Sequence, residues 1–369
     1  MNWLTAISAQ WQFAVGLRLL LLALALSLLQ PAPVLVTPGP PQTVASTRPY
    51  LGVHTRLADE VEPWKIQRSL QLVREMGAPW IIEFFPWAYY HYDEDGFVWH
   101  QPDLIISHAA AQGLQVVARL GMTPHWARPP DTPLNYLDAA GYPHFAAYAA
   151  AFAERYQGRV TAVIIGNEPN LSFEWGYRLT TAADYVELLS VVYPAVKAAN
   201  PDMLVLAGAL APTLEPEGSP WGRNDLEYLD LMYAAGARDY FDGLAVHTYG
   251  FTFPPELEPA PELLNFRRVE LLREIMIRHG DEEKRIYITE TGWNDHPRWT
   301  RAVRPGQRIE YTLDALRYAE THWPYVELVG LWMFRLPAPS RSYMDYFTLV
   351  TPEFVKKPIY EELRSFTGN

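Results

Sequence analysis

The sequence of 369 residues contains no cysteine. This absence excludes disulfide bonds, zinc-thiolate sites, iron–sulfur clusters and catalysis by a thiol. Basic residues are also scarce: 30 Lys and Arg stand against 42 Asp and Glu, which gives a formal net charge of −12. Nucleic acid is therefore not an expected partner, because phosphate binding needs clustered positive charge.

Several motifs that mark other chemistries are missing. The sequence has no His-x-His pair, no His-Glu-x-x-His and no aspartate cluster at metal-ligand spacing, so we expect neither a metal nor a cofactor. It also lacks a Gly-x-Ser-x-Gly nucleophile elbow and a glycine-rich phosphate turn. Aromatic residues, in contrast, reach 14%, which suits a large core or a surface that stacks on flat ligands.

The N-terminus predicts a targeting segment over residues 1–30. Arg18 precedes an apolar run from Leu19 to Leu29, whose length is typical of a signal peptide and short for a membrane span of about 20 residues. An uncleaved signal anchor and a buried helix of the domain are the alternatives. A proline-rich linker is predicted over 31–48 and a single domain over 49–369. We therefore expect an extracytoplasmic protein that contacts a membrane only through its N-terminal segment.

From residue 49 onward, short apolar runs alternate with amphipathic segments. Strands are predicted at 51–54, 80–85, 114–120, 163–165, 203–207, 243–247, 286–290 and 326–334. Helices are predicted at 64–76, 103–111, 145–156, 181–200, 225–235, 262–279, 307–322 and after Pro358. Strict alternation implies parallel strands joined by crossover helices, and eight units predict an α/β fold of the (β/α)₈ (TIM) barrel type. A doubly wound open sheet is the alternative, but it lacks its usual phosphate turn here.

Two of these strands end in a glutamate. The fourth strand runs into Ile164-Ile165-Gly166-Asn167-Glu168-Pro169, and the seventh runs into Ile288-Thr289-Glu290-Thr291-Gly292-Trp293. Because active residues of a (β/α)₈ barrel lie at the C-terminal strand ends, the two carboxylates are predicted to meet there. Two carboxylates about 5 Å apart can perform retaining hydrolysis of a glycosidic bond.

The combination of Asn167-Glu168-Pro169-Asn170-Leu171, a later Trp175, His247-Thr248-Tyr249, Thr289-Glu290-Thr291-Gly292-Trp293 and Trp332 resembles clan A retaining glycoside hydrolases. The pattern is most similar to family 39, with similarities to families 5, 53 and 17, and it covers the whole predicted barrel. The resemblance implies a glycosidase that hydrolyses O-glycosyl bonds of a polysaccharide or oligosaccharide. A carbohydrate is thus the expected partner.

The resemblance also implies roles for individual residues. Glu168 would be the general acid/base and Glu290 the nucleophile. Tyr249 would hold the nucleophile, His247 would support the acid/base, and Asn167 would bind the sugar 2-hydroxyl. The remaining predicted substrate-binding residues are Trp332, Glu83, Arg119, His54, Trp293 and Trp175.

One position departs from family 5, whose members carry an arginine near the end of the second strand. This chain has Glu83 there, with Arg119 as a candidate replacement and Glu83 itself as a candidate third carboxylate. A carbohydrate-binding barrel without activity and a transglycosylase are the alternative functions. The sequence specifies neither the sugar and linkage, nor endo or exo action, nor the oligomeric state.

Overall fold

The computed structural model describes residues 3–28, 36–93 and 96–369, which divide into two compact units, Met1–Thr37 and Pro38–Asn369. The described helix of the first unit is α1 (Trp3–Leu28). Within the described part of the chain, no helix is both long and apolar enough to cross a membrane. The junction predicted between targeting segment and linker falls in 29–35, outside the described residues.

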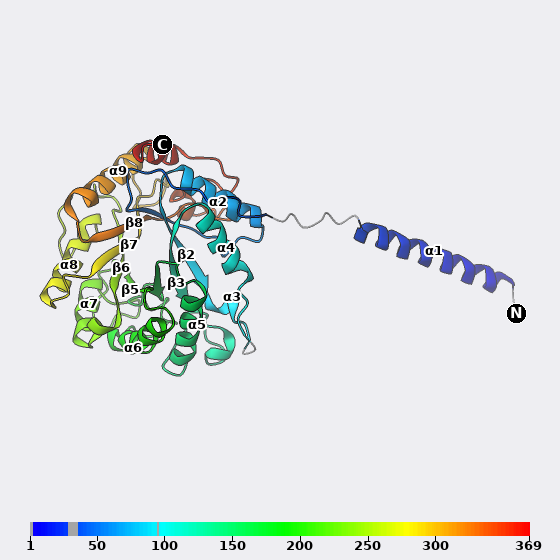
Figure 1. The fold of residues 1–369 in the computed structure, drawn as a ribbon, viewed down its shortest axis with the longest axis horizontal. Coiled ribbons are helices and arrows are strands. Elements are labelled where there is room, and N and C mark those ends of the chain that lie inside the picture. Colours follow the sequence, from blue (N-terminus) through cyan, green and yellow to red (C-terminus); the bar gives the residue numbers. More distant parts are fainter. Residues whose placement is uncertain (1–2, 29–35, 94–95) are drawn as a thin grey trace. The chain divides into compact units, whose positions relative to one another are not determined.

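The second unit is a closed barrel of eight parallel strands that follow one another in sequence order, with helices around the outside (Figure 1). The strands are β1 (Leu51–His54), β2 (Trp80–Pro86), β3 (Gln115–Gly121), β4 (Ala162–Ile165), β5 (Leu204–Leu210), β6 (Gly243–Tyr249), β7 (Arg285–Gly292) and β8 (Val326–Leu331). The helices are α2 (Pro63–Glu75), α3 (Trp87–Tyr90), α4 (His100–Ala111), α5 (Tyr142–Arg155), α6 (Ala182–Ala199), α7 (Asp225–Ala234), α8 (Val269–Arg278), α9 (Pro305–His322) and α10 (Pro358–Phe366). The predicted (β/α)₈ barrel is confirmed.

The strands are buried on both faces, which explains their nearly continuous apolar runs. One set of side chains fills the barrel interior, including Trp80, Ile82, Val117, Ile164, Leu206, Tyr287 and Leu328. The alternate set packs outward against the helices, including Val53, Ile81, Val116, Val163, Val205, Leu244 and Ile286. Burying both faces fixes the strand register, and this register decides which side chains reach the C-terminal rim.

The helices begin where the sequence offers caps or a proline. Thr181 Oγ1 accepts the N–H of Asp184 at the start of α6, and Pro63, Pro305 and Pro358 open α2, α9 and α10. The helix predicted over 262–279 is wrong over its first two turns. The α-helix begins only at Val269, after a short 3₁₀ turn, η3 (Phe266–Arg268).

The cause of this difference is Asn265, whose side-chain amide donates hydrogen bonds to the carbonyls of Leu257 (2.8 Å) and Glu258 (3.0 Å). These bonds hold the preceding segment as a loop. A side chain that offers the backbone such an alternative partner competes with helix formation.

The segment predicted as the end of the linker packs against the barrel. The N–H of Gln42 donates to the carbonyl of Ala111 at the end of α4 (2.7 Å), and the N–H of Thr47 donates to Thr367 O after α10 (3.0 Å). The compact unit accordingly begins at Pro38 rather than at residue 49. This segment is held against the barrel because its N–H groups donate to carbonyls at helix ends, which have no intrahelical partners.

Candidate active site

A cleft of about 810 Å³ opens at the C-terminal ends of the strands. Of the predicted site residues, its walls contain Arg119, Asn167, Glu168, Trp175, Tyr249, Glu290 and Trp332. These side chains come from β3, β4, β6, β7, β8 and the loops that follow them. The barrel therefore brings together residues that are up to 213 positions apart in the sequence, from Arg119 to Trp332.

Glu168 stands in a strained turn after β4. Gly166 leaves the strand with a φ of 81°, and Glu168 itself has a φ of 42°, in the left-handed region that non-glycine residues rarely adopt. Its N–H donates to the carbonyl of Ala209 on β5 at 2.9 Å, which helps to hold this conformation. Backbone strain of this kind costs about 1–3 kcal/mol and is typical of functional sites.

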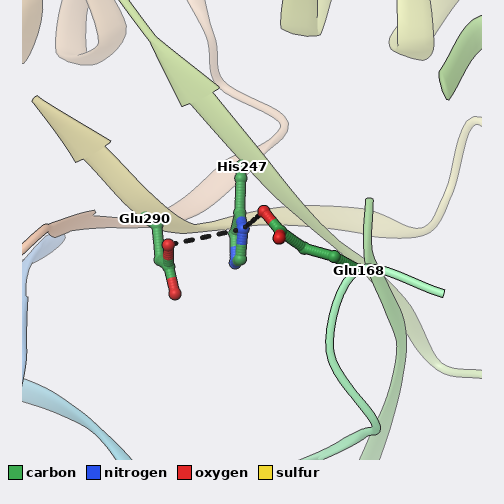
Figure 2. A group of neighbouring side chains, drawn as sticks. All are labelled: Glu168, His247 and Glu290. Carbon is green, nitrogen blue, oxygen red and sulfur yellow. Dashed lines mark hydrogen bonds and ion pairs between the residues drawn. The ribbon is translucent and has the colours of Figure 1, made fainter. Parts of the chain in front are cut away.

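The imidazole of His247 lies between two carboxylates, as Figure 2 shows. Its Nδ1 is 2.7 Å from Oε1 of Glu168 and 3.5 Å from Oε2 of Glu290. Only 3% of His247 is exposed, so the ring is fixed by packing as well as by these contacts. The structure thus places the His247 imidazole against the carboxylate that it was predicted to support.

Glu290 is surrounded by the Tyr249 hydroxyl, the Arg119 guanidinium and the His54 and His247 imidazoles. The hydroxyl of Tyr249 donates to Oε2 at 2.8 Å. Nη1 of Arg119 and Nε2 of His54 lie 3.6 and 3.7 Å from Oε1. His54 is buried and is not among the residues of the cleft walls, and its ring packs against the Trp332 indole with centroids 4.5 Å apart.

The two glutamates face each other closely. One carboxylate oxygen of Glu168, one of Glu290 and a ring nitrogen of His247 all lie within 4.8 Å of one another. Carboxyl groups about 5–5.5 Å apart are typical of retaining glycosidases, whereas inverting enzymes separate them by about 6.5–9.5 Å. The separation of at most 4.8 Å between these two oxygens is shorter than the inverting spacing.

The two carboxyl groups differ in their electrostatic surroundings. Burial raises the pKa of Glu168 to about 7, and the Arg119 charge only partly offsets this effect. Burial also raises the pKa of Glu290, as does the neighbouring Glu168 carboxylate, whereas the Arg119 charge and the Tyr249 hydroxyl act to lower it. Burial lowers the pKa of His247 to about 4, so this ring is neutral near pH 7. Glu168 is thus the group suited to carry a proton.

Asn167 is held by charged neighbours on both sides. Arg119 Nη1 donates to its Oδ1 at 2.8 Å, and its Nδ2 donates to Oε1 of Glu174 at 3.0 Å. Glu174 also lines the cleft, and burial raises its pKa. Sequence reasoning missed this third carboxylate because Glu174 does not stand at the end of a strand. The signal that could have found it is its position seven residues after Asn167.

Aromatic side chains from later loops complete the cleft walls. Trp175 and Trp332 were predicted, whereas the analysis of strand ends missed Phe251, Tyr343 and Phe347; Trp299 also lines the cleft. Trp299 and Tyr343 stack with ring centroids 4.8 Å apart, although 44 residues separate them in the chain. No motif marks such residues, because their meeting depends on how two loops fold over the rim.

Glu83 lies outside the cleft, which corrects its prediction as a substrate contact. The side chain is fully buried, and it accepts hydrogen bonds from Thr55 Oγ1 (2.5 Å) and from the N–H groups of Leu57 (2.9 Å) and Ala58 (3.1 Å). The carboxylate therefore organises the loop after β1. The prediction failed because Glu83 lies in the middle of β2, three residues before the strand ends at Pro86, where the loop after β1 folds against it.

Trp293 is also wrongly predicted as a substrate contact. It is 2% exposed, packs against Phe266 and Tyr311, and donates its indole N–H to the carbonyl of Phe253 at 2.8 Å. Gly250 approaches the indole so closely that a Cβ there would overlap it. The indole therefore packs beneath the loop that follows β6.

Among the described residues, Glu168, His247 and Glu290 are also the group whose ligand atoms are close enough to hold a cation. The chemistry of the neighbours opposes such binding. The Arg119 guanidinium lies 3.6 Å from Glu290 and already supplies positive charge to this carboxylate. A divalent ion at the same place would meet direct repulsion.

The fold and the site together define a (β/α)₈ barrel with an acidic, aromatic-lined cleft at its C-terminal rim. Neither a protein-family model nor a curated protein matches the chain. Several solved structures, in contrast, are similar to it. A family 39 glycoside hydrolase from the gut symbiont Bacteroides cellulosilyticus WH2 is 21% identical, with a TM-score of 0.69 over 89% of this chain and 65% of that one.

Two further structures are similar. GH5_18 from Streptomyces cattleya, in complex with GlcNAc, is 16% identical, with a TM-score of 0.65 over 87% of this chain and 80% of that one. The exo-β-1,4-mannosidase Op5Man5 from Opitutaceae bacterium strain TAV5 is 16% identical, with a TM-score of 0.59 over 89% of this chain and 62% of that one. The chain thus spans less than two thirds of the family 39 protein and of the mannosidase. The resemblance to family 39 is confirmed at the level of the fold.

Proposed function

We propose that this protein is a retaining O-glycoside hydrolase that cleaves an oligosaccharide or polysaccharide by double displacement. The observation that carries the proposal is the pair Glu168 and Glu290, whose carboxylate oxygens lie within 4.8 Å in different electrostatic surroundings. The similar structures include a family 39 glycoside hydrolase and a mannosidase, which supports the same class of reaction.

In the first step, a carboxylate oxygen of Glu290 attacks the anomeric carbon of the sugar. Glu168 gives its proton to the glycosidic oxygen, so the bond to the leaving group breaks as the ester to Glu290 forms. Tyr249 and Arg119 hold the Glu290 carboxylate in place. Because the Glu168 carboxyl has a pKa of about 7, a large fraction carries the required proton at neutral pH.

In the second step, the deprotonated Glu168 takes a proton from a water molecule. The water oxygen attacks the anomeric carbon, the ester breaks, and Glu290 regains its charge. Two inversions at one carbon restore the original anomeric configuration. The Asn167 amide, fixed between Arg119 and Glu174, is placed to donate a hydrogen bond to a sugar hydroxyl beside the reacting carbon.

The test is hydrolysis of a panel of 4-nitrophenyl α- and β-glycosides by the wild type and by Glu290→Ala. Glu283→Ala, an exposed glutamate before β7 at the opposite end of the barrel, serves as the matched control. We expect the wild type and the control to release nitrophenol from at least one glycoside, with NMR showing retained configuration. Sugar binding without hydrolysis would instead identify a binding protein, and transfer exceeding hydrolysis at high acceptor concentration would identify a transglycosylase.

We further propose that the barrel acts outside the cytoplasm, led there by the N-terminal segment. The support is the apolar run from Leu19 to Leu29 behind Arg18. A fusion of residues 1–48 to alkaline phosphatase, which is active only after export, tests this point. Activity equal to that of a fusion to residues 38–48 would contradict it.

A further inference from the structure

The loop after β5 carries an exposed tryptophan beside the proposed acid/base. Trp221 is 69% exposed, an unusual state for an indole, which is mostly buried in folded proteins. Phe173 (44% exposed) and Tyr177 (72% exposed) stand on the neighbouring loop after β4, the loop that also contains Glu168. Three exposed aromatic side chains thus gather on two adjacent loops at one side of the cleft.

The two loops are joined by their backbones. Leu171 and Gly222 form an antiparallel bridge, and the N–H of Ser172 donates to the carbonyl of Trp221 at 3.0 Å. A Cβ at Gly222 would lie only 2.7 Å from the carbonyl oxygen of Asn170, so this close approach requires glycine. Leu171 and Phe173 line the cleft, which places Trp221 immediately beyond its edge.

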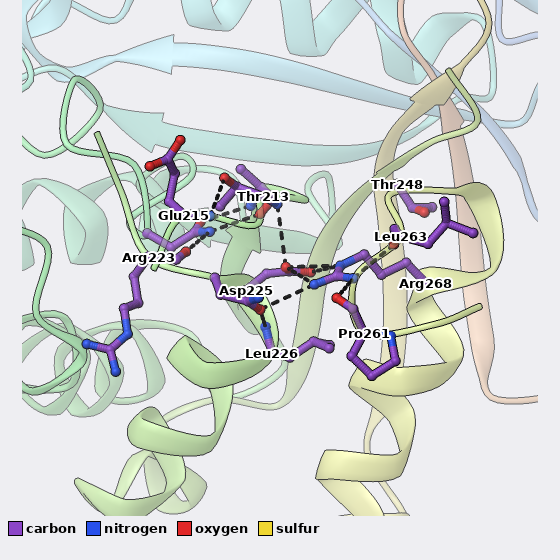
Figure 3. Close-up of polar contacts among 12 residues, drawn as sticks. Thr213, Glu215, Arg223, Asp225, Leu226, Thr248, Pro261, Leu263 and Arg268 are labelled. Atoms are coloured by element: carbon purple, nitrogen blue, oxygen red, sulfur yellow. Dashed lines mark hydrogen bonds and ion pairs between the residues drawn. The ribbon is translucent and has the colours of Figure 1, made fainter. Parts of the chain in front are cut away.

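The base of the Trp221 loop is also fixed. Asn170 is fully buried, and its side chain bonds both the N–H and the carbonyl of Ala211 at 2.9 Å, where the loop begins. At the other end, Asp225 and Arg268 form a buried ion pair of 2.8 Å, which Figure 3 shows together with the neighbouring polar contacts of the loop. Both ends of the loop that carries Trp221 are therefore held by buried polar contacts, which reduces the ordering entropy that binding would cost.

The proposed chemistry predicts on which side of the cleft the leaving group binds. A general acid protonates the oxygen of the departing group, so the leaving group must lie beside Glu168 rather than beside Glu290. The loops that carry Phe173 and Trp221 follow β4 and β5, on the Glu168 side of the barrel. A flat indole or phenyl ring offers an apolar face to the C–H groups of a sugar ring.

We propose that Trp221, with Phe173, forms a sugar-binding subsite for the leaving group. This inference rests on the proposed hydrolase function. It assigns the substrate class: a glycan whose departing portion is itself made of sugar units, rather than a sugar joined to a small non-carbohydrate group.

The experiment compares wild type, Trp221→Ala and Trp64→Ala. Trp64 is 45% exposed on α2, and it serves as the matched control because it packs on Phe354 and lies outside the cleft walls. The substrates are the accepted 4-nitrophenyl glycoside and the hexasaccharides cellohexaose, mannohexaose and xylohexaose. Binding of the same hexasaccharides is measured by calorimetry in the Glu290→Ala background, with and without Trp221→Ala.

We expect Trp221→Ala to lower kcat/KM for a hexasaccharide about tenfold more than for the aryl glycoside, and to weaken hexasaccharide binding by a similar factor. Trp64→Ala should change neither. If Trp221→Ala affects both substrates equally, or affects neither, the subsite is overturned while the hydrolase function stands. The same conclusion follows if the wild type cleaves aryl glycosides but neither cleaves nor binds any hexasaccharide. If the wild type cleaves no probe and the Glu290→Ala protein binds none, the subsite and the proposed function both fall.

Discussion

The hydroxyl of Tyr249 donates a hydrogen bond of 2.8 Å to Oε2 of Glu290, and this bond links the end of β6 to the end of β7. It fixes the carboxylate in one orientation and favours its charged form. A nucleophile must be both oriented and ionised, so the proposed mechanism depends on this contact.

Tyr249→Phe removes this donor with little change of shape. We expect kcat to fall about 10–100-fold, because a hydrogen bond to a charged group contributes about 1.5–3 kcal/mol. The acidic limb of the kcat/KM profile should move to higher pH, since the ionised form of Glu290 loses support. Tyr343→Phe is the control: it lines the same cleft, and its hydroxyl makes no hydrogen bond within the described residues. An unchanged pH profile in Tyr249→Phe would contradict the assigned role.

Glu168 sets the alkaline side of the pH dependence. With a pKa of about 7, its proton is present below that pH and lost above it, so kcat/KM should decline as the pH rises through 7. In Glu168→Gln this limb should vanish. The variant should lose about 10²–10⁴-fold with poor leaving groups, and much less with dinitrophenol, which departs without protonation. Rates measured across a leaving-group series check this prediction.

The carboxyl group of Glu168 also reduces the stability of the folded protein at alkaline pH. Folding raises its pKa from the ordinary 4.5 to about 7, so the folded state binds this proton more tightly than the unfolded chain. The resulting stabilisation is complete below pH 4.5 and is lost as the pH rises through 7. Glu168→Gln should therefore raise the melting temperature by a few degrees at pH 8 and by little at pH 4.

A thermal scan at both pH values decides this point. Glu217→Gln is the control, because the Glu217 side chain is 82% exposed. Equal melting temperatures of wild type and Glu168→Gln at pH 8 would show that the carboxylate carries no such penalty.

Glu290→Ala removes the nucleophile and should lower kcat by about 10⁴-fold or more. The cavity that it leaves admits a small anion. Added azide should restore turnover of an activated aryl glycoside and give a glycosyl azide of inverted configuration, because one displacement replaces two. An azide product of retained configuration would identify a different residue as the nucleophile.

The buried pair of Asp225 and Arg268 gives a prediction about stability. Both side chains are 1% exposed, so Arg268→Met leaves a buried carboxylate without its partner. Such a loss costs about 3–5 kcal/mol, whereas replacing both partners, with Asp225→Leu added, should recover most of it. Urea unfolding measures the difference. Arg278→Met breaks the exposed pair with Asp230 and should cost only about 0–1 kcal/mol.

Much of the site was predictable because a parallel barrel imposes a simple rule. A residue that ends a strand reaches the rim, and this rule alone places Glu168, Tyr249 and Glu290 together. The rule failed at Glu83, which lies in the middle of β2 rather than at its end and accepts hydrogen bonds from N–H groups of the loop after β1. It failed again at Trp293, whose indole turns beneath the β6 loop.

Loop residues were the part that the sequence pattern did not locate. Glu174 and Trp299 follow no periodicity, and their positions depend on contacts between loops that are distant along the chain. Trp221 could be named as part of a long loop after β5. Its place beside the acid/base became visible only through the bridge between Leu171 and Gly222.

The sequence by itself determined the order of strands and helices, the barrel that closes them and the two glutamates at its rim. Local hydrophobic patterns encode these features, since a strand buried on both faces must be apolar and its polar end must lie at the edge. Only the tertiary structure decided the spacing of the carboxylates, the orientation of His247 between them and the identity of the cleft walls. These depend on strand register and loop packing, which are set by contacts between residues far apart in the chain.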